Sequence, residues 1–202
     1  MRYVISKAHP ELQEETLSLN TFRQACNFLW ILNTINRLTN EQIQRGNLMN
    51  PDTFSGQLYE RICQQTSKKT ITRFFNKIIR AFDGDQEGLK RALTQQDDYG
   101  YTPLHKATWN NDNPEVVGAL IASLQQAFNG TPQELQQALA RPENNGITPL
   151  HFTAQNNNSE VMRVLIASLN QAFAGSPQGL QVALTRQDND DRTPLHFTAR
   201  ND

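Results

Sequence analysis

Three histidines recur at the same place in a repeated motif and are the first candidates for chemistry. His105, His151 and His196 each follow the tripeptide Thr-Pro-Leu. Imidazole groups can bind a metal ion or transfer a proton. Equivalent residues of stacked repeats, however, stand about 10 Å apart, one layer of packed helices, which is too far to share a zinc ion. The spacing therefore argues against a metal site.

The remaining chemical candidates lack a supporting pattern. His9 could act with Cys26, or with Glu14 and Glu15, but a nucleophile needs an adjacent base and an orienting partner. The sequence contains no GxSxG, HExxH, phosphate-binding glycine loop or paired CxxC. We predict that the chain is not an enzyme and needs no cofactor or metal. The alternative is that it targets a larger enzyme whose catalytic part lies in residues 1–70 or outside this sequence.

Charge and composition exclude two classes of partner. The 202 residues carry 19 basic and 20 acidic side chains, so no net field attracts nucleic acid or an anionic membrane. The basic side chains between Lys68 and Arg80 alternate with apolar ones, as on a solvated helix face. The longest apolar run, residues 28–32, is too short to span a membrane. Cys26 and Cys63 are predicted to be buried and reduced, so we expect a cytoplasmic protein.

An internal repeat must position these residues. The segments YTPLHKAT, ITPLHFTA and RTPLHFTA begin at residues 101, 147 and 192, so the motif recurs after 46 and then 45 residues.

The sequence of each unit predicts three helices. The first begins at Thr-Pro and ends in an Asn-rich turn with a left-handed Asn. The second helix spans 114–128 in the first copy and 159–173 in the second, and it closes at Gly130 and Gly175 respectively. The third helix begins at a capping Thr131 in the first copy and a capping Ser176 in the second. We assign the one-residue difference between copies to Asn113-Pro114 standing where the second copy has only Ser159.

None of these helices is apolar enough to be stable alone, so neighbours must stack into an all-α solenoid. The predicted array covers residues 71–202, as a degenerate unit (71–96), two repeats (97–142 and 143–187) and a partial repeat (188–202). Residues 1–70 form a helical N-terminal cap region. Its helices are expected from Thr21 to Leu38, from Thr39, and from Pro51 to Gln65, before a long helix over 69–82 enters the array. The sequence stops without a polar cap, which suggests a fragment.

The repeated motif D-x-x-G-x-T-P-L-H-x-A resembles the signature of the ankyrin repeat family. The first copy matches it from Asp97 to Ala107. The second departs at Glu143 and Thr153, and the third has Asp191 in place of Gly, where we expect the same positive φ with some strain. Ordinary ankyrin units have about 33 residues. These enlarged units, with their third helix, resemble ankyrin-repeat effectors of intracellular bacterial pathogens.

The resemblance implies that the histidines hydrogen-bond the turns and that the concave face binds another protein. By the same resemblance, the partner is a host protein reached in the host cytosol, while the oligomeric state stays open. Phe152 and Phe197 can equally pack between neighbouring first helices. The candidate partner-binding residues occupy the turn tips and first helices: Tyr99, Tyr101, Lys106, Trp109, Asn110, Asn145, Ile147, Phe152, Gln155, Arg192, Phe197 and Arg200.

Overall fold

The computed structural model describes residues 29–31, 33–50, 54–64, 68–109, 113–156 and 158–199. The chain forms two compact units, residues 1–37 and residues 38–202. Residues 33–37 of the first unit are helical. In the second unit the described residues form helices joined by short loops and include no strand, which confirms the predicted all-α class.

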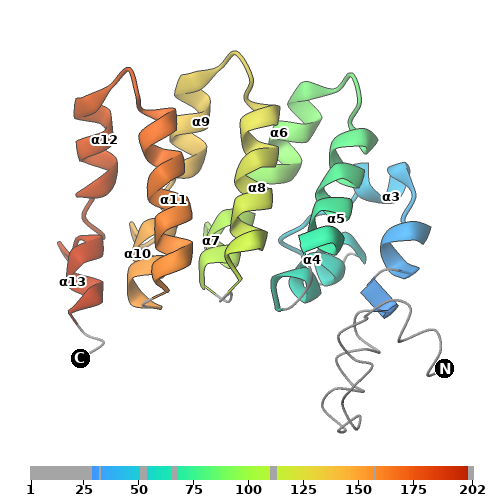
Figure 1. Cartoon of the computed structure of the whole chain (residues 1–202), viewed down its shortest axis with the longest axis horizontal. Coiled ribbons are helices and arrows are strands. Elements are labelled where there is room, and N and C mark those ends of the chain that lie inside the picture. The colour runs from blue at the N-terminus through green and yellow to red at the C-terminus, as the bar shows by residue number, and fades with distance from the viewer. Residues whose placement is uncertain are drawn as a thin grey trace, which may run out of the picture. The chain divides into compact units, whose positions relative to one another are not determined.

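The helices of the second unit repeat in sets of three (Figure 1). The first helices α4, α7, α10 and α13 lie along the lower edge of the view, and the third helices α6, α9 and α12 lie along the upper edge. The second helices α5, α8 and α11 pack on one another between them, and α7, α10 and α13 pack in series. The bounds are Asn40–Gln44 for α3, Phe54–Gln64 for α4, Lys68–Ala81 for α5, Gln86–Thr94 for α6, Pro103–Trp109 for α7, Pro114–Ala127 for α8, Pro132–Leu139 for α9, Pro149–Gln155 for α10, Ser159–Ala172 for α11, Pro177–Leu184 for α12 and Pro194–Thr198 for α13.

Most predicted helices lie within one residue of their expected ends. The start of α3 is confirmed by a capping box, in which the Thr39 side chain accepts from Gln42 N and Gln42 accepts from Thr39 N. The start predicted for α4 at Pro51, and most of the helix predicted from Thr21, lie outside the described residues. The boundary predicted near residue 70 falls inside α5.

Two local predictions were wrong, and a third is tested only in part. Asn156 ends α10 in the right-handed region, at φ −79° and ψ −4°, because its backbone N–H bonds the Phe152 carbonyl as a further helical turn would. The other asparagines predicted as left-handed helix ends, Asn110, Asn111 and Asn157, lie outside the described residues. Thr131 and Ser176 precede α9 and α12 without a side-chain capping bond; the Thr131 hydroxyl instead donates to the Phe128 carbonyl. Asn113 and Asn158 both cap second helices, so the extra residue of the first copy lies in the loop before them.

Helix α5 enters the array with one apolar side. Phe74 and Phe75 are buried with their ring centroids 5.3 Å apart, and Tyr59 of α4 lies 6.3 Å from Phe74. The Tyr59 hydroxyl donates to the Pro103 carbonyl at 2.6 Å, which ties α4 to the start of α7. The basic side chains of α5 are mostly exposed, and Lys68 pairs with Glu115 at the surface. The solvated helix face predicted for this stretch is therefore confirmed.

An acidic side chain organises each turn between units. One oxygen of Asp97 accepts from the backbone N–H groups of Tyr99 (3.0 Å) and Tyr101 (2.9 Å). Glu143 does the same in the second copy at 2.8 and 3.0 Å, and Asp188 does so in the third at 3.0 and 2.8 Å. Glutamate at position 143 therefore keeps the function of the aspartate that the motif usually has there.

The motif histidines join one copy to the next. His105 Nδ1 accepts from Thr102 N at 3.1 Å, so its protonated Nε2 donates to the Ile147 carbonyl of the following turn at 3.2 Å. His151 repeats both bonds with Thr148 and Arg192, each at 3.1 Å. Both rings are fully buried. The structural role expected for these two histidines is confirmed.

Consecutive turns also bond each other through the backbone. The Asn144 N–H donates to the Tyr99 carbonyl at 3.1 Å, and the Asn189 N–H donates to the Asn145 carbonyl at 2.9 Å. The turns need positive φ angles at the motif glycine. Gly100 has φ +85° and Asp191, its counterpart in the third copy, has φ +61°, as predicted. A Cβ at Gly100 would lie 2.6 Å from Asn144 Oδ1 and 2.9 Å from Asn144 N.

The turn geometry predicts opposite effects at these two positions. Gly100→Ala should destabilise the fold by at least about 1 kcal/mol, because alanine disfavours positive φ and its methyl group collides with Asn144. Asp191→Gly should stabilise it by about 0.5 to 1 kcal/mol, because the strain of a side chain at positive φ is removed. Chemical unfolding followed by circular dichroism measures both, and a stabilised Gly100 variant would contradict this account.

The buried histidines predict a fall in stability with acid. Burial lowers the pKa of His105 from 6.5 to about 4, and it also lowers the pKa of His151. Between pH 6.5 and 4 the unfolded chain binds a proton that folded His105 does not, so the free energy of unfolding should fall by up to about 3 kcal/mol. Below about pH 4 this group contributes no further change.

Unfolding curves recorded across that window test the histidine effect. His105→Gln should flatten the dependence of the free energy of unfolding on pH, because the variant lacks the buried ring. An equal slope for the natural chain and the His105 variant would show that this ring is not the acid-sensitive group.

Candidate functional site

The buried titratable side chains of the array take part in structural contacts. Burial raises the pKa of the Cys63 thiol to about 12, so it stays protonated and cannot act as a nucleophile. His105 and His151 are fully buried, and each ring is hydrogen-bonded to the following copy. No group of three or more His, Cys, Asp or Glu side chains in the described ranges could hold a metal ion. His9, Glu14, Glu15 and Cys26 lie outside these ranges.

Four predicted residues come together as an aromatic cluster: Tyr99, Tyr101, Trp109 and Phe152. The rings of Trp109 and Phe152 are stacked, with centroids 5.1 Å apart and an interplanar angle of 9°. Tyr101 lies 5.5 Å from Trp109, 5.8 Å from Phe152 and 6.3 Å from Tyr99. The turn tip and α7 of one copy and α10 of the next therefore contribute to a single surface.

The members of the aromatic cluster differ in exposure. Tyr99 is 70% exposed and Trp109 is 47% exposed, so both offer ring area to solvent. Phe152 is only 4% exposed and stacks on the Trp109 ring, while Tyr101 is half-buried. Partial burial raises the pKa of Tyr101, so its hydroxyl stays neutral at physiological pH. Large exposed aromatic side chains on a rigid base are typical of protein-binding surfaces.

Two asparagines hold the exposed rings in place, a role that sequence reasoning missed. The Asn156 amide donates to the Thr108 carbonyl at 2.9 Å and the Trp109 carbonyl at 2.5 Å, which fixes the end of α7. The Asn144 amide donates to the Asp98 carbonyl at 3.0 Å, beside Tyr99. Asparagine at both turns was visible in the sequence, but its partners lie in the preceding copy and only the stacking reveals them.

The third copy arranges its predicted residues differently. The Arg192 guanidinium pairs with Asp188 at 2.8 Å and Asp190 at 2.7 Å, and it lies 5.1 Å from the centre of the Phe197 ring. Phe197 is 6% exposed and also contacts the His151 ring, at 5.1 Å between centroids. These two side chains are thus engaged with their own copy and with the one before it.

The other candidates flank the aromatic cluster without joining it. Lys106 is half-buried on α7, and Gln155 is exposed at the end of α10. Asn145 is exposed and donates through its amide to Glu143, and Ile147 is half-buried with its carbonyl bound by His105. Asn110 and Arg200 lie outside the described residues.

Comparison with known proteins gives the family of the repeats. The family model described as ankyrin repeats (3 copies) matches residues 123–202, and that described as ankyrin repeat matches residues 99–127. A search of curated proteins found no match. No helix in the described part of the chain is long and apolar enough to cross a membrane. The two matches together cover residues 99–202, just over half of the sequence, and the chain belongs to the ankyrin repeat family.

Proposed function

We propose that this chain binds a partner protein through the aromatic cluster and the turn tips beside it. Ankyrin repeats indicate a protein interaction module. The observation that supports this surface is the pair of exposed rings, Tyr99 and Trp109, held on buried Phe152. A rigid aromatic side chain buries a large area on binding and loses little conformational entropy.

The first copy differs from its neighbours at this surface. The positions of Tyr99, Tyr101 and Trp109 are occupied by Asn145, Ile147 and Gln155 in the second copy. Three aromatic side chains therefore gather where the following unit has smaller or polar ones, while the buried Thr-Pro-Leu-His beside them is the same in both copies. Side chains that vary over a repeated framework are the ones available to select a partner. We infer that the first copy provides the central contacts and that Asn145 and Gln155 lie at the polar rim.

We further propose that the partner is a host protein and that the chain is part of a bacterial effector. The support is the resemblance of these 46- and 45-residue units to those of effectors from intracellular bacteria. The alternative is that the array targets a larger enzyme, and in that case the same surface would select the substrate protein. Both versions predict binding through Tyr99 and Trp109.

Removal of the two exposed rings tests the proposed surface. In affinity capture from eukaryotic lysate, read by mass spectrometry, the natural chain should retain a protein that Tyr99→Ala/Trp109→Ala loses. The affinity for that purified protein should fall at least about 30-fold, because exposed aromatic anchors of this kind contribute about 2 kcal/mol or more. Isothermal titration calorimetry measures the change.

Two controls make the result specific. Leu195→Ala removes another exposed apolar side chain, 76% exposed on α13 and outside the aromatic cluster, and should leave binding unchanged. Bacterial lysate, treated in the same way, should lack the captured protein if the partner belongs to a host. Equal retention by the natural chain and the double variant, with helicity unchanged, would reject the aromatic cluster as the binding surface.

A further inference from the structure

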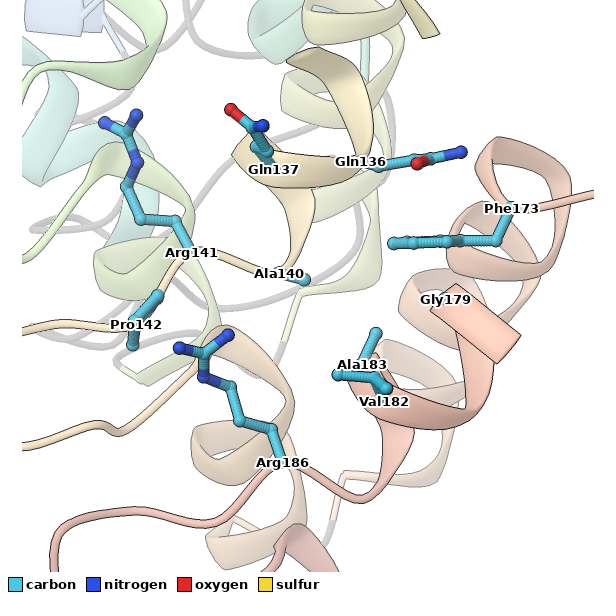
Figure 2. Close-up of a pocket in the computed structure, with 10 residues that line it drawn as sticks. All are labelled: Gln136, Gln137, Ala140, Arg141, Pro142, Phe173, Gly179, Val182, Ala183 and Arg186. Atoms are coloured by element: carbon cyan, nitrogen blue, oxygen red, sulfur yellow. The ribbon is translucent and has the colours of Figure 1, made fainter. Parts of the chain in front are cut away.

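A pocket of about 470 Å³ opens between the third helices α9 and α12 (Figure 2). Its apolar wall consists of Ala140 on one side and Phe173, Val182 and Ala183 on the other. Pockets of this volume with a mostly apolar lining and a few polar groups are typical ligand sites. None of its lining residues belongs to the aromatic cluster, so it is a separate surface.

Two arginines give this pocket a positive rim. Arg141 and Arg186 line it together, with Pro142 beside them, and Figure 2 shows both on the side away from Phe173. They occupy equivalent positions in successive copies. Neither guanidinium forms an ion pair with another residue of the described ranges, whereas Arg192 and Lys90 each do. Paired guanidinium groups beside an apolar surface suit a carboxylate attached to an apolar group.

The chain itself fills the equivalent space one copy earlier. Between α6 and α9, the Lys90 amine pairs with the Glu134 carboxylate at 2.6 Å and lies 5.3 Å from the centre of the Phe128 ring. This interaction places an ion pair against an aromatic wall, with the ammonium group over the Phe128 ring. It shows, within the same protein, that a carboxylate occupies this kind of gap when a cationic group pairs with it.

The pocket is open because two residues differ between the copies. Gln136 of α9 occupies the position that Lys90 has in α6, and its amide donates to the Ala172 carbonyl at 2.9 Å. Gly179 of α12 occupies the position that Glu134 has in α9, so this position has no side chain to cross the gap. Phe173 repeats Phe128, and the aromatic wall is therefore kept while the ion pair that covers it is lost.

We propose that this pocket, named here the α9/α12 groove, binds an acidic peptide segment of a partner protein. A large apolar side chain of the peptide lies on Phe173, Val182 and Ala183, and a neighbouring Asp or Glu pairs with Arg141 and Arg186. A peptide fits better than a small enclosed ligand because Val182 is 62% exposed, which leaves the groove accessible from outside along α12. The groove thus adds a second, sequence-selective contact to the proposed interaction module.

The test begins with a displayed library of random peptides selected on the purified chain. The enriched peptides should combine a large apolar residue with an adjacent Asp or Glu. A fluorescent copy of the best peptide is then titrated, with anisotropy as the readout. Arg141→Gln/Arg186→Gln should weaken binding at least about tenfold, because both charge-assisted contacts are lost.

A second variant closes the groove by copying the preceding unit. Gln136→Lys/Gly179→Glu restores the residues that pair between α6 and α9, and it should also weaken binding at least about tenfold. A Cβ at position 179 would lie 2.6 Å from Ser176 Oγ, so this hydroxyl must turn away, as the Thr131 hydroxyl does by bonding the Phe128 carbonyl. The same Cβ would lie 3.0 Å from Phe173 Cδ1, so the ring must also shift by a few tenths of an ångström. Circular dichroism and the unfolding midpoint confirm that each variant is folded.

Tyr99→Ala/Trp109→Ala serves as the matched control and should leave peptide affinity unchanged, which separates this site from the aromatic cluster. The proposal is overturned if no peptide is enriched, if the enriched peptides lack acidic residues, or if groove closure leaves their affinity unchanged. It is also overturned if decanoate, tested alone, requires the open groove while no peptide does, since the occupant would then be a small amphiphile.

Discussion

The structure depends on one buried interaction, the histidine that bridges each copy to the next. Its Nδ1 accepts from the threonine at the start of its own helix, and its Nε2 donates to a carbonyl of the following turn. The ring can form both bonds only when neutral, and burial lowers its pKa to keep it so. Because the bond connects a helix start to a distant turn, it fixes where the next copy begins.

The turns complete what the histidines begin. An acidic side chain closes each turn on itself, and the Asn144 and Asn189 N–H groups attach it to the turn before. Few of these bonds use the side chains that project from the tips. The tips can therefore carry Tyr99 in one copy and Asn145 in the next without loss of the stacking, which separates the residues that build the array from those available to a partner.

Differences between near-identical copies create both proposed sites. Tyr99, Tyr101 and Trp109 make one turn and first helix aromatic where the next copy has smaller or polar residues. Gly179 replaces the equivalent of Glu134, whose carboxylate pairs with Lys90 between α6 and α9. Without that carboxylate, the apolar wall between α9 and α12 is open beside Arg141 and Arg186. The added third helix thus supplies a surface distinct from the one made by the turns and first helices.

The amino-acid sequence predicts the repeat, its three helices and the positive φ of Asp191, because capping residues, apolar periodicity and motif geometry act locally. The hydrogen bonds of the motif histidines follow from the resemblance to the ankyrin signature. The sequence could not determine the end of α10, where Asn156 stays right-handed and bonds the preceding copy. Nor could it decide between partner binding and packing for Phe152, which is buried and stacks on exposed Trp109. These points follow from the stacked structure, because exposure and pairing depend on which residues of neighbouring copies face each other.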